Sequence, residues 1–233
     1  MTHTAAAVVH WLQRRLHDLP DGDGWLSTRE RTVQDRLVVP KRRADWRLGR
    51  WTAKALVAAV LDVEVVRVSI IAAPDGAPEA LVDELPAPIS LSISHRAGVG
   101  LAAVGEHVVV GGDLEVIEPR SPAFVREWFG EHEQALIAEI RDPRRRDELT
   151  CLLWSVKEAS AKVLREGLRL DPRGASVVLD DDRVPDEPSG HWQRSTVRWA
   201  TEGRVVSGWW RVDGSFVRAI AGDRPTDVPQ ELR

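Results

Sequence analysis

The stretch HVVVGGDLEVIE, residues 107–118, decides the fold that the sequence predicts. Its β-branched residues indicate a strand, and its central pair of glycines permits a bulge or the close approach of another backbone. Asp113 and Glu115 are two residues apart, so on a strand both carboxylates leave one face while Leu114 and Val116 point to the other. The stretch therefore predicts a strand with two acids on one side.

Upstream, the sequence predicts two helices and then strands. Ser27 or Thr28, with polar residues three positions later, is a capping signature that opens a helix. A second helix follows, because apolar residues recur every three or four positions at Leu48, Trp51, Ala55, Leu56, Ala59 and Val60, between Trp46 and Leu61. Residues 63–73 predict a strand closed by the turn PDGAP, and residues 88–105 predict a hairpin. The run AAAVVHWL, residues 5–12, fits either a first strand or a helix.

Downstream, a long helix is predicted from Asp147 to Leu164 by its apolar stripe. The strings SVVLDDD, HWQRSTVRWA, RVVSGWWRV and SFVRAIAG predict short strands, and the end after Pro225 is expected to be loose. The fold class is therefore α+β. A boundary near Gly105 divides the chain into two units, 1–105 and 106–233.

Composition narrows the classes of function. The 233 residues carry a net charge of -4, which gives no global field to attract nucleic acid. The single cysteine, Cys151, cannot form an internal disulfide and is expected to be an inert core residue, so we expect a cytoplasmic protein. The apolar run near the N-terminus is too short to span a bilayer, so no membrane association is expected.

Two further charged residues share one face of the long helix. Glu158 and Lys162 are four residues apart and lie away from its apolar stripe. Hard oxygen ligands such as those of Asp113 and Glu115 suit Mg²⁺, which also binds water and substrate phosphate. Taken alone, however, the strand acids also fit a solvated acidic face, and Glu158 with Lys162 fits an ordinary exposed ion pair. The residues by themselves leave these interpretations open.

Five short motifs occur one after another between about residues 40 and 170: RRADWRLGR, DGAP, SISH, GGDLE and WSVKEASAK. In this order they resemble the surfactin-synthetase-activating type of 4'-phosphopantetheinyl transferase. The resemblance implies two similar α+β lobes with pseudo-twofold symmetry, active as a monomer, with coenzyme A in the cleft between them. It also implies Mg²⁺-dependent transfer of the phosphopantetheine arm to a serine of an apo acyl, aryl or peptidyl carrier protein, with release of 3',5'-ADP.

The resemblance also assigns the catalytic residues. Asp113, Glu115 and Glu158 match the three magnesium-binding acids of the family. Lys162 matches its phosphate-facing lysine, and Lys157 stands where the family also keeps a lysine near the cofactor. The chemistry fits, because attack on the β-phosphorus builds charge that Mg²⁺ and Lys162 can neutralise. Glu158 or Glu115 could accept the serine proton, and the choice stays open.

A second group of residues is implied to bind the nucleotide of coenzyme A. Arg42 and Arg50, which flank Trp46, match positions used against its 3'-phosphoadenosine part, where permanently charged planar groups suit a phosphate. Ser94 and His95 match an element that touches the same nucleotide.

The chain departs from the family pattern at three positions. Ala77 stands where the family often has a basic residue, so the resemblance does not supply the phosphate contact of that residue. Gly112 replaces a usual β-branched residue, and Arg165 replaces a common small one.

Other interpretations compete with this one. A non-catalytic module that binds carrier proteins or coenzyme A would need the same surfaces, and a different magnesium-dependent enzyme could cleave the pyrophosphate with water.

A hydrolase built on Ser94 and His95 is disfavoured because neighbours on a strand face opposite ways. The DGDG turn at residues 21–24 lacks the acidic residue of a calcium loop, since Thr32 occupies that position. The charge run at residues 141–148 fits a solvated helix start or a carrier-docking surface.

Overall fold

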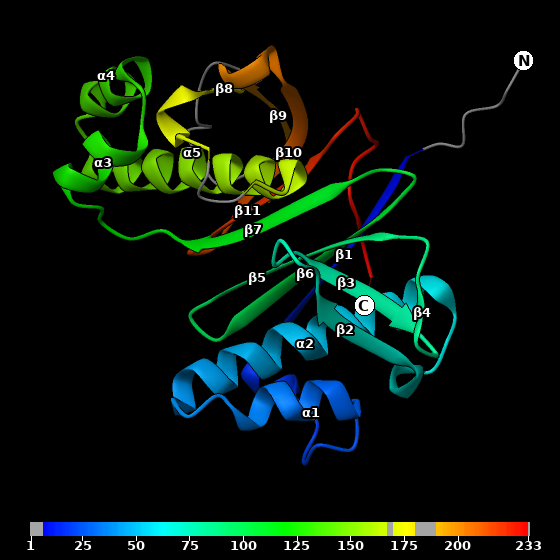
Figure 1. Ribbon diagram of the computed structural model, residues 1–233. Helices are drawn as coiled ribbons and strands as arrows, with labels where there is room; N and C mark the ends of the chain where they lie inside the picture. The colour runs from blue at the N-terminus through cyan, green and yellow to red at the C-terminus, as the bar shows by residue number, and fades with distance from the viewer. Residues whose placement is uncertain (1–6, 167–169, 180–189, 233) are drawn as a thin grey trace, which may run out of the picture.

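The computed structural model describes residues 7–166, 170–179 and 190–232. Within these ranges it is a mixed α+β structure in which two larger sheets and one small sheet are covered by helices (Figure 1). No helix in the described ranges is both long and apolar enough to cross a membrane.

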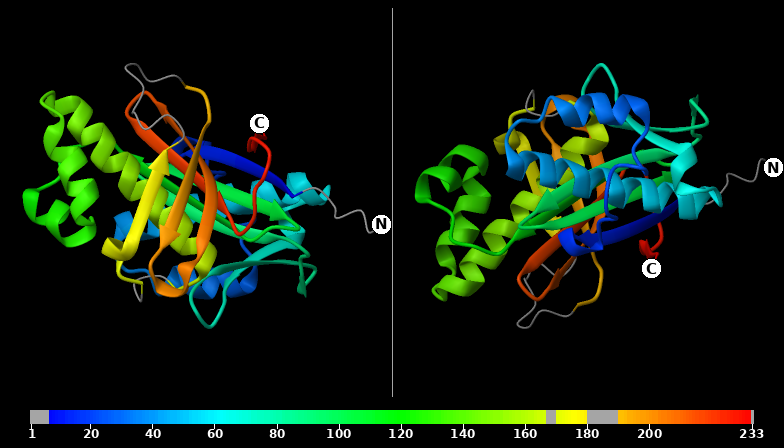
Figure 2. Two further views of the ribbon diagram at one scale, coloured as in Figure 1. Left: turned by 90° about the horizontal axis from the view of Figure 1, so that it is seen from above. Right: turned by 90° about the horizontal axis from the view of Figure 1, so that it is seen from below.

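The first part of the chain builds a four-stranded sheet and a small three-stranded one. The four-stranded sheet has the strand order β12-β1-β6-β5, and the small sheet has the order β2-β3-β4. Helix α2 packs on β1, β5 and β6 of the four-stranded sheet, and α1 packs on α2 and on β2 of the small sheet (Figure 2). The elements are β1 (Val8–Arg15), α1 (Thr28–Asp35), α2 (Pro40–Leu61), β2 (Val68–Ala72), β3 (Pro78–Val82), β4 (Leu85–Pro86), β5 (Ser90–Arg96) and β6 (Val99–Glu106).

The second part builds a five-stranded antiparallel sheet with the strand order β7-β11-β10-β9-β8. Helix α5 packs along β7 and β11 (Figure 1). The elements are β7 (Val110–Val116), α3 (Pro122–Trp128), α4 (Glu131–Glu139), α5 (Pro143–Leu164), β8 (Ala175–Leu179), β9 (Gln193–Trp199), β10 (Val205–Asp213), β11 (Phe216–Gly222) and β12 (Gln230–Glu231).

Most predicted elements are confirmed, with shifted ends. Ser27 caps α1, and its side chain and that of Glu30 form the reciprocal capping box. Helices α2 and α5 begin earlier than predicted because a proline occupies the first turn of each, where its missing N–H has no intrahelical partner. The N-terminal apolar run forms strand β1. Ala59 is exposed, so the buried face of α2 is rotated slightly from the predicted stripe.

One prediction about the rest of the chain is corrected, and two helices were missed. The end of the chain is not loose: β12 pairs in parallel with β1, through Gln230 opposite His10 and Glu231 opposite Trp11. Helices α3 and α4 were not predicted. The first is only seven residues long, and α4 has a weak amphipathic pattern, so neither produced a clear signal.

The two long helices share a buried ion pair of the same design. Lys54 on α2 binds Glu30 and the carbonyl of Trp25. Lys157 on α5 binds Glu133 and the carbonyl of Trp128, and each of these residues lies 103 positions after its counterpart (54 to 157, 30 to 133, 25 to 128). Both helices contain 22 residues and end in a left-handed cap. The two parts of the chain thus repeat one helix arrangement.

The two larger sheets meet along a seam where β5 lies beside β7. Alternate serines of β5 face β7, and each accepts a hydrogen bond from a β7 backbone N–H: Ser90 from Val110 (3.0 Å), Ser92 from Gly112 (2.9 Å) and Ser94 from Leu114 (3.3 Å). A buried apolar cluster that combines residues of both sheets, including Trp11, Leu101, Leu114 and Ile220, packs beside this seam. The side chains therefore join the two parts where their backbones do not pair.

Candidate functional site

Asp113 lies at the seam and is buried among donors from both sides of it. Its Oδ1 accepts hydrogen bonds from the Ser94 hydroxyl (3.0 Å), on β5, and from Lys162 Nζ (2.9 Å), on α5. Its Oδ2 accepts from the Ser155 hydroxyl (2.9 Å), also on α5. A carboxylate has about four acceptor positions, so these three bonds fix its orientation and leave capacity for one further partner.

Glu115 points from the same face of β7, as the two-residue spacing predicts. Its Oε2 forms ion pairs with Arg120 (2.8 Å) and Arg96 (3.5 Å). Burial raises the pKa of Glu115, and the nearby charge of Asp113 raises it further, whereas the two arginines lower it. The second strand acid is therefore near Asp113 but is held by cations of its own.

Glu158 on α5 completes the group of acids. Burial is the main reason that its pKa is raised; Asp113 and Glu115 raise it further, and Lys162 opposes them. The carboxylate of Glu158 makes no ion pair or hydrogen bond within the described part of the chain. Three acids distant in the sequence thus act on one another electrostatically.

The donor chemistry of these acids fits Mg²⁺. Carboxylate oxygens are the hard ligands that this ion prefers, and a cation beside them would relieve their mutual repulsion. The carboxylates are not in metal-coordinating positions, however, since no set of three or more His, Cys, Asp or Glu side chains in the described ranges is arranged to hold a metal. Magnesium binding by Asp113, Glu115 and Glu158 therefore stays a prediction.

Lys162 is brought to this site by the close contact between α5 and β7. Its Nζ donates to the carbonyl of Gly112 (2.8 Å) as well as to Asp113. A Cβ at Gly111 would lie 2.0 Å from the carbonyl oxygen of Ala159, so only glycine permits this helix to approach the strand so closely. The glycine pair noted in the sequence therefore does have the predicted role of close approach.

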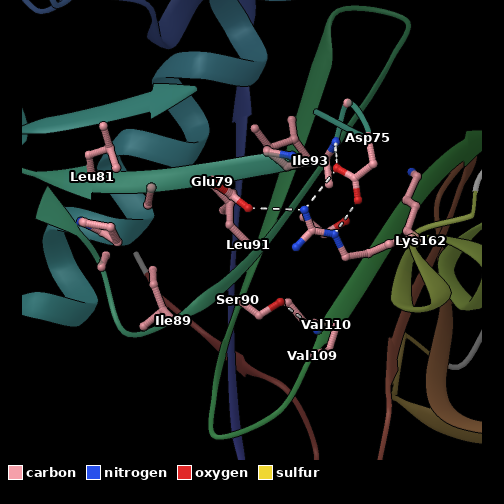
Figure 3. Close-up of a pocket in the computed structure, with 18 residues that line it drawn as sticks. Asp75, Glu79, Leu81, Ile89, Ser90, Leu91, Ile93, Val109, Val110 and Lys162 are labelled. Carbon is pink, nitrogen blue, oxygen red and sulfur yellow. Dashed lines mark hydrogen bonds and ion pairs between the residues drawn. The ribbon is translucent and has the colours of Figure 1, made fainter. Parts of the chain in front are cut away.

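A pocket of about 620 Å³ opens at the seam next to Lys162, and we call it the seam pocket. Lys162 and Asp75 lie at one end of it, and Ile89 and Val109 lie at the other (Figure 3). Its wall includes β3, β5, the start of β7 and the end of α5. The apolar side chains of the wall are Leu81, Ile89, Leu91, Ile93, Val109 and Val110. The seam pocket is therefore lined by charged side chains of both signs at the end near Lys162 and by apolar side chains farther away.

A second pocket, of about 580 Å³, contains the predicted nucleotide-binding residues Arg42, Arg50 and His95, and we call it the arginine pocket. The Arg50 guanidinium stacks over the ring of Trp46 at 5.1 Å, and its Nε is buried with no hydrogen-bond partner in the described ranges. Burial lowers the pKa of Arg50. A buried donor without an acceptor, in a pocket that Arg42 also lines, is suited to an anionic group.

The side chains of Ser94 and His95 point to opposite faces of β5, because the two residues are neighbours on a strand. His95 lines the arginine pocket, where desolvation lowers the pKa of its imidazole and favours the neutral form. The Ser94 hydroxyl instead accepts from Leu114 N–H and donates to Asp113. Ser94 thus helps to hold Asp113, and its contact with a nucleotide stays a prediction.

The prediction that Lys157 lies near the cofactor is wrong. It is almost fully buried, and its Nζ is enclosed by Glu133, the carbonyl of Trp128 (3.3 Å) and the carbonyl of Pro172 (2.8 Å). Neighbouring residues on a helix differ by about 100° in direction, so Lys157 cannot share the face of Glu158. Lys157 joins α5 to α4 and does not reach the site.

Sequence reasoning missed Ser155, Arg96 and Arg120. Ser155 had a usable signal, because it lies three residues before Glu158 and so shares its helix face. Arg96 is the last residue of β5 and Arg120 follows β7, and the pairing of both with Glu115 depends on the tertiary fold. Cys151 is buried as predicted, and burial raises the pKa of its thiol.

Comparison with known families adds an independent finding. Residues 109–209 match the model of the 4'-phosphopantetheinyl transferase superfamily. The matched segment runs from the start of β7 into β10 and includes Asp113, Glu115, Glu158 and Lys162. No curated protein matches the chain.

Proposed function

We propose that this protein is a 4'-phosphopantetheinyl transferase of the surfactin-synthetase-activating type. It transfers the arm of coenzyme A to a serine of an apo carrier protein and releases 3',5'-ADP. The observation that carries the proposal is the position of the acids and Lys162 beside the seam, with the seam pocket and the arginine pocket both within reach of strand β5. The superfamily match over residues 109–209 supports the same reaction class.

The chemistry of the two pockets suits the two ends of coenzyme A. The 3'-phosphoadenosine part occupies the arginine pocket, where Arg42 and Arg50 meet its phosphate and Trp46 provides an aromatic surface. The uncharged arm occupies the seam pocket, whose far end is apolar. The diphosphate then lies between them beside Lys162. In this arrangement the lobes 1–105 and 106–233 hold the cofactor between them.

Different residues of the site have different roles in the proposed reaction. Asp113, Glu115 and Glu158 would hold Mg²⁺, and the ion would supply positive charge against the diphosphate. Lys162 supplies a second positive charge, and Ser94, Ser155 and Lys162 keep Asp113 oriented.

The structure also bears on the choice of general base. Arg96 and Arg120 hold Glu115, whereas no arginine or lysine pairs directly with Glu158 in the described ranges. Burial raises the pKa of both Glu115 and Glu158, which suits either carboxylate to accept a proton, so the arginine partners of Glu115 make the difference between them. We therefore assign the proton acceptor to Glu158, acting directly or through a water molecule.

Intact-protein mass spectrometry tests the proposal. Purified protein, Mg²⁺, coenzyme A and an apo carrier domain should give a carrier that is heavier by one phosphopantetheine group. Glu158→Gln should abolish this gain, while Glu139→Gln, an exposed acid on α4, should leave it intact. A folded protein that modifies no carrier from a panel of acyl and peptidyl types would reject the proposal.

The same experiment separates the alternatives. A non-catalytic module would bind coenzyme A and leave every carrier unmodified. A pyrophosphate-cleaving enzyme that uses water would release 3',5'-ADP without any carrier. Relative rates across the panel would show which biosynthetic pathway the enzyme serves. Cytoplasmic location and a monomeric state remain predictions from the sequence.

A further inference from the structure

Arg165 forms a bridge across the seam pocket. It is the left-handed cap residue at the end of α5, and it lines the pocket together with Lys162. Its Nε donates to Asp75 Oδ2 (2.8 Å), and its Nη2 donates to Asp75 Oδ1 (3.0 Å) and to Glu79 Oε1 (3.2 Å). These acids belong to the turn before β3 and to β3 itself. The bridge therefore connects α5 to the small sheet of the other part of the chain.

The surroundings of the bridge indicate that it faces the pocket's contents. Asp75, Glu79 and Arg165 all line the seam pocket, and so does Ala77, whose short side chain brings no charge to the same turn. The guanidinium is the main reason that the pKa of Asp75 falls to about 2, so the Asp75 carboxylate stays ionised at neutral pH. In Figure 3 the carboxylates of Asp75 and Glu79 both point toward one guanidinium, that of Arg165, to which the dashed lines run.

We propose that Arg165 is a specificity-determining residue for the arm of coenzyme A. With Asp75 and Glu79 it closes the seam pocket over the uncharged arm, and it contributes little to binding of the nucleotide end. This inference rests on the proposed function and extends it. The planar guanidinium can hold two carboxylates in one orientation, which a lysine ammonium at the same position could not do.

Two ligands separate this role from a general effect on the fold. Coenzyme A carries the arm, whereas 3',5'-ADP has the nucleotide end without it. Calorimetric titration of each ligand, without any carrier, measures binding in the absence of turnover. Arg165→Ala should weaken coenzyme A binding about fivefold, the size expected for loss of one partly exposed ion-pair cluster. Its effect on 3',5'-ADP should stay within about twofold, the usual limit for independent sites.

Three further variants make the result decisive. Asp75→Asn should reproduce the selective loss from the other side of the bridge, and Arg165→Lys should restore only part of it. Arg67→Ala is the matched control, because Arg67 forms an exposed two-point ion pair with Asp83 away from the seam pocket. It should leave the affinities for both ligands unchanged.

Each outcome decides the inference. Equal weakening of both ligands, or no weakening of coenzyme A, would overturn the role of Arg165 while leaving the proposed transferase intact. If the wild-type protein binds neither ligand, the proposed function fails and the inference fails with it.

Discussion

Gly111→Ala probes the contact that places α5 on β7. A Cβ at this position would lie 2.0 Å from the carbonyl oxygen of Ala159 and 3.0 Å from the backbone nitrogen of Val163. Both obstacles are backbone atoms of the helix, so no side-chain rotation can relieve the clash. The carbonyl must retreat from 2.0 Å to at least 3.0 Å, which moves the helix that carries Glu158 and Lys162 away from Asp113.

The expected loss of stability follows from this geometry. Overpacking usually costs about 1–3 kcal/mol, and a backbone obstacle places Gly111→Ala near the upper end. For a chain of this size each kcal/mol corresponds to about 2–4 °C, so we expect the melting temperature to fall by about 6–12 °C. Gly24→Ala is the control, because an added Cβ there meets nothing within 4 Å.

Thermal unfolding followed by circular dichroism measures this difference. Transfer activity, measured below the melting temperature of the variant, should fall as well, because the acids and Lys162 no longer meet. A Gly111→Ala protein as stable and as active as Gly24→Ala would refute the view that this contact positions the site.

The remaining predictions concern charge. In the presence of EDTA, Glu158→Gln should raise the melting temperature at pH 7.5, because a carboxyl whose folded pKa is raised loses stability as pH rises from its ordinary value near 4.5 through the folded value. At pH 4 the difference should vanish, and a variant that is less stable at both values would contradict the shift. Arg50→Ala should weaken binding of both coenzyme A and 3',5'-ADP by about tenfold or more in calorimetry, because the ligand phosphate loses a buried cationic partner; unchanged 3',5'-ADP binding would remove Arg50 from the nucleotide site. Lys157→Met should cost about 3–5 kcal/mol in chemical unfolding by leaving Glu133 buried and unpaired, and the double variant with Glu133→Gln should recover much of that loss; additive losses would show that the pair is not coupled.

Local rules were sufficient for much of the fold. The capping residues Ser27 and Glu30 predicted the start of α1, and the alternation around Leu91 and Ile93 predicted the hairpin of β5 and β6. Strand β12 could not be predicted, because two residues carry no pattern and their pairing with β1 spans nearly the whole chain.

The site was predictable where spacing fixes direction. A period of two placed Asp113 and Glu115 on one face, and a spacing of four placed Glu158 with Lys162. The WSVKEASAK string does not by itself give the direction of Lys157, whose position on the helix turns it toward Glu133 and away from the site. The partners of Glu115 depend on tertiary structure that no local pattern contains.

The central claim is that Asp113, Glu115 and Glu158 together bind one divalent ion against the diphosphate of coenzyme A. A crystal structure of the protein with Mn²⁺ and coenzyme A, using the anomalous signal of manganese, tests it most directly. The account predicts one ion bound by all three carboxylates and by a diphosphate oxygen beside Lys162. An ion bound elsewhere, or coenzyme A bound away from the seam, would contradict it.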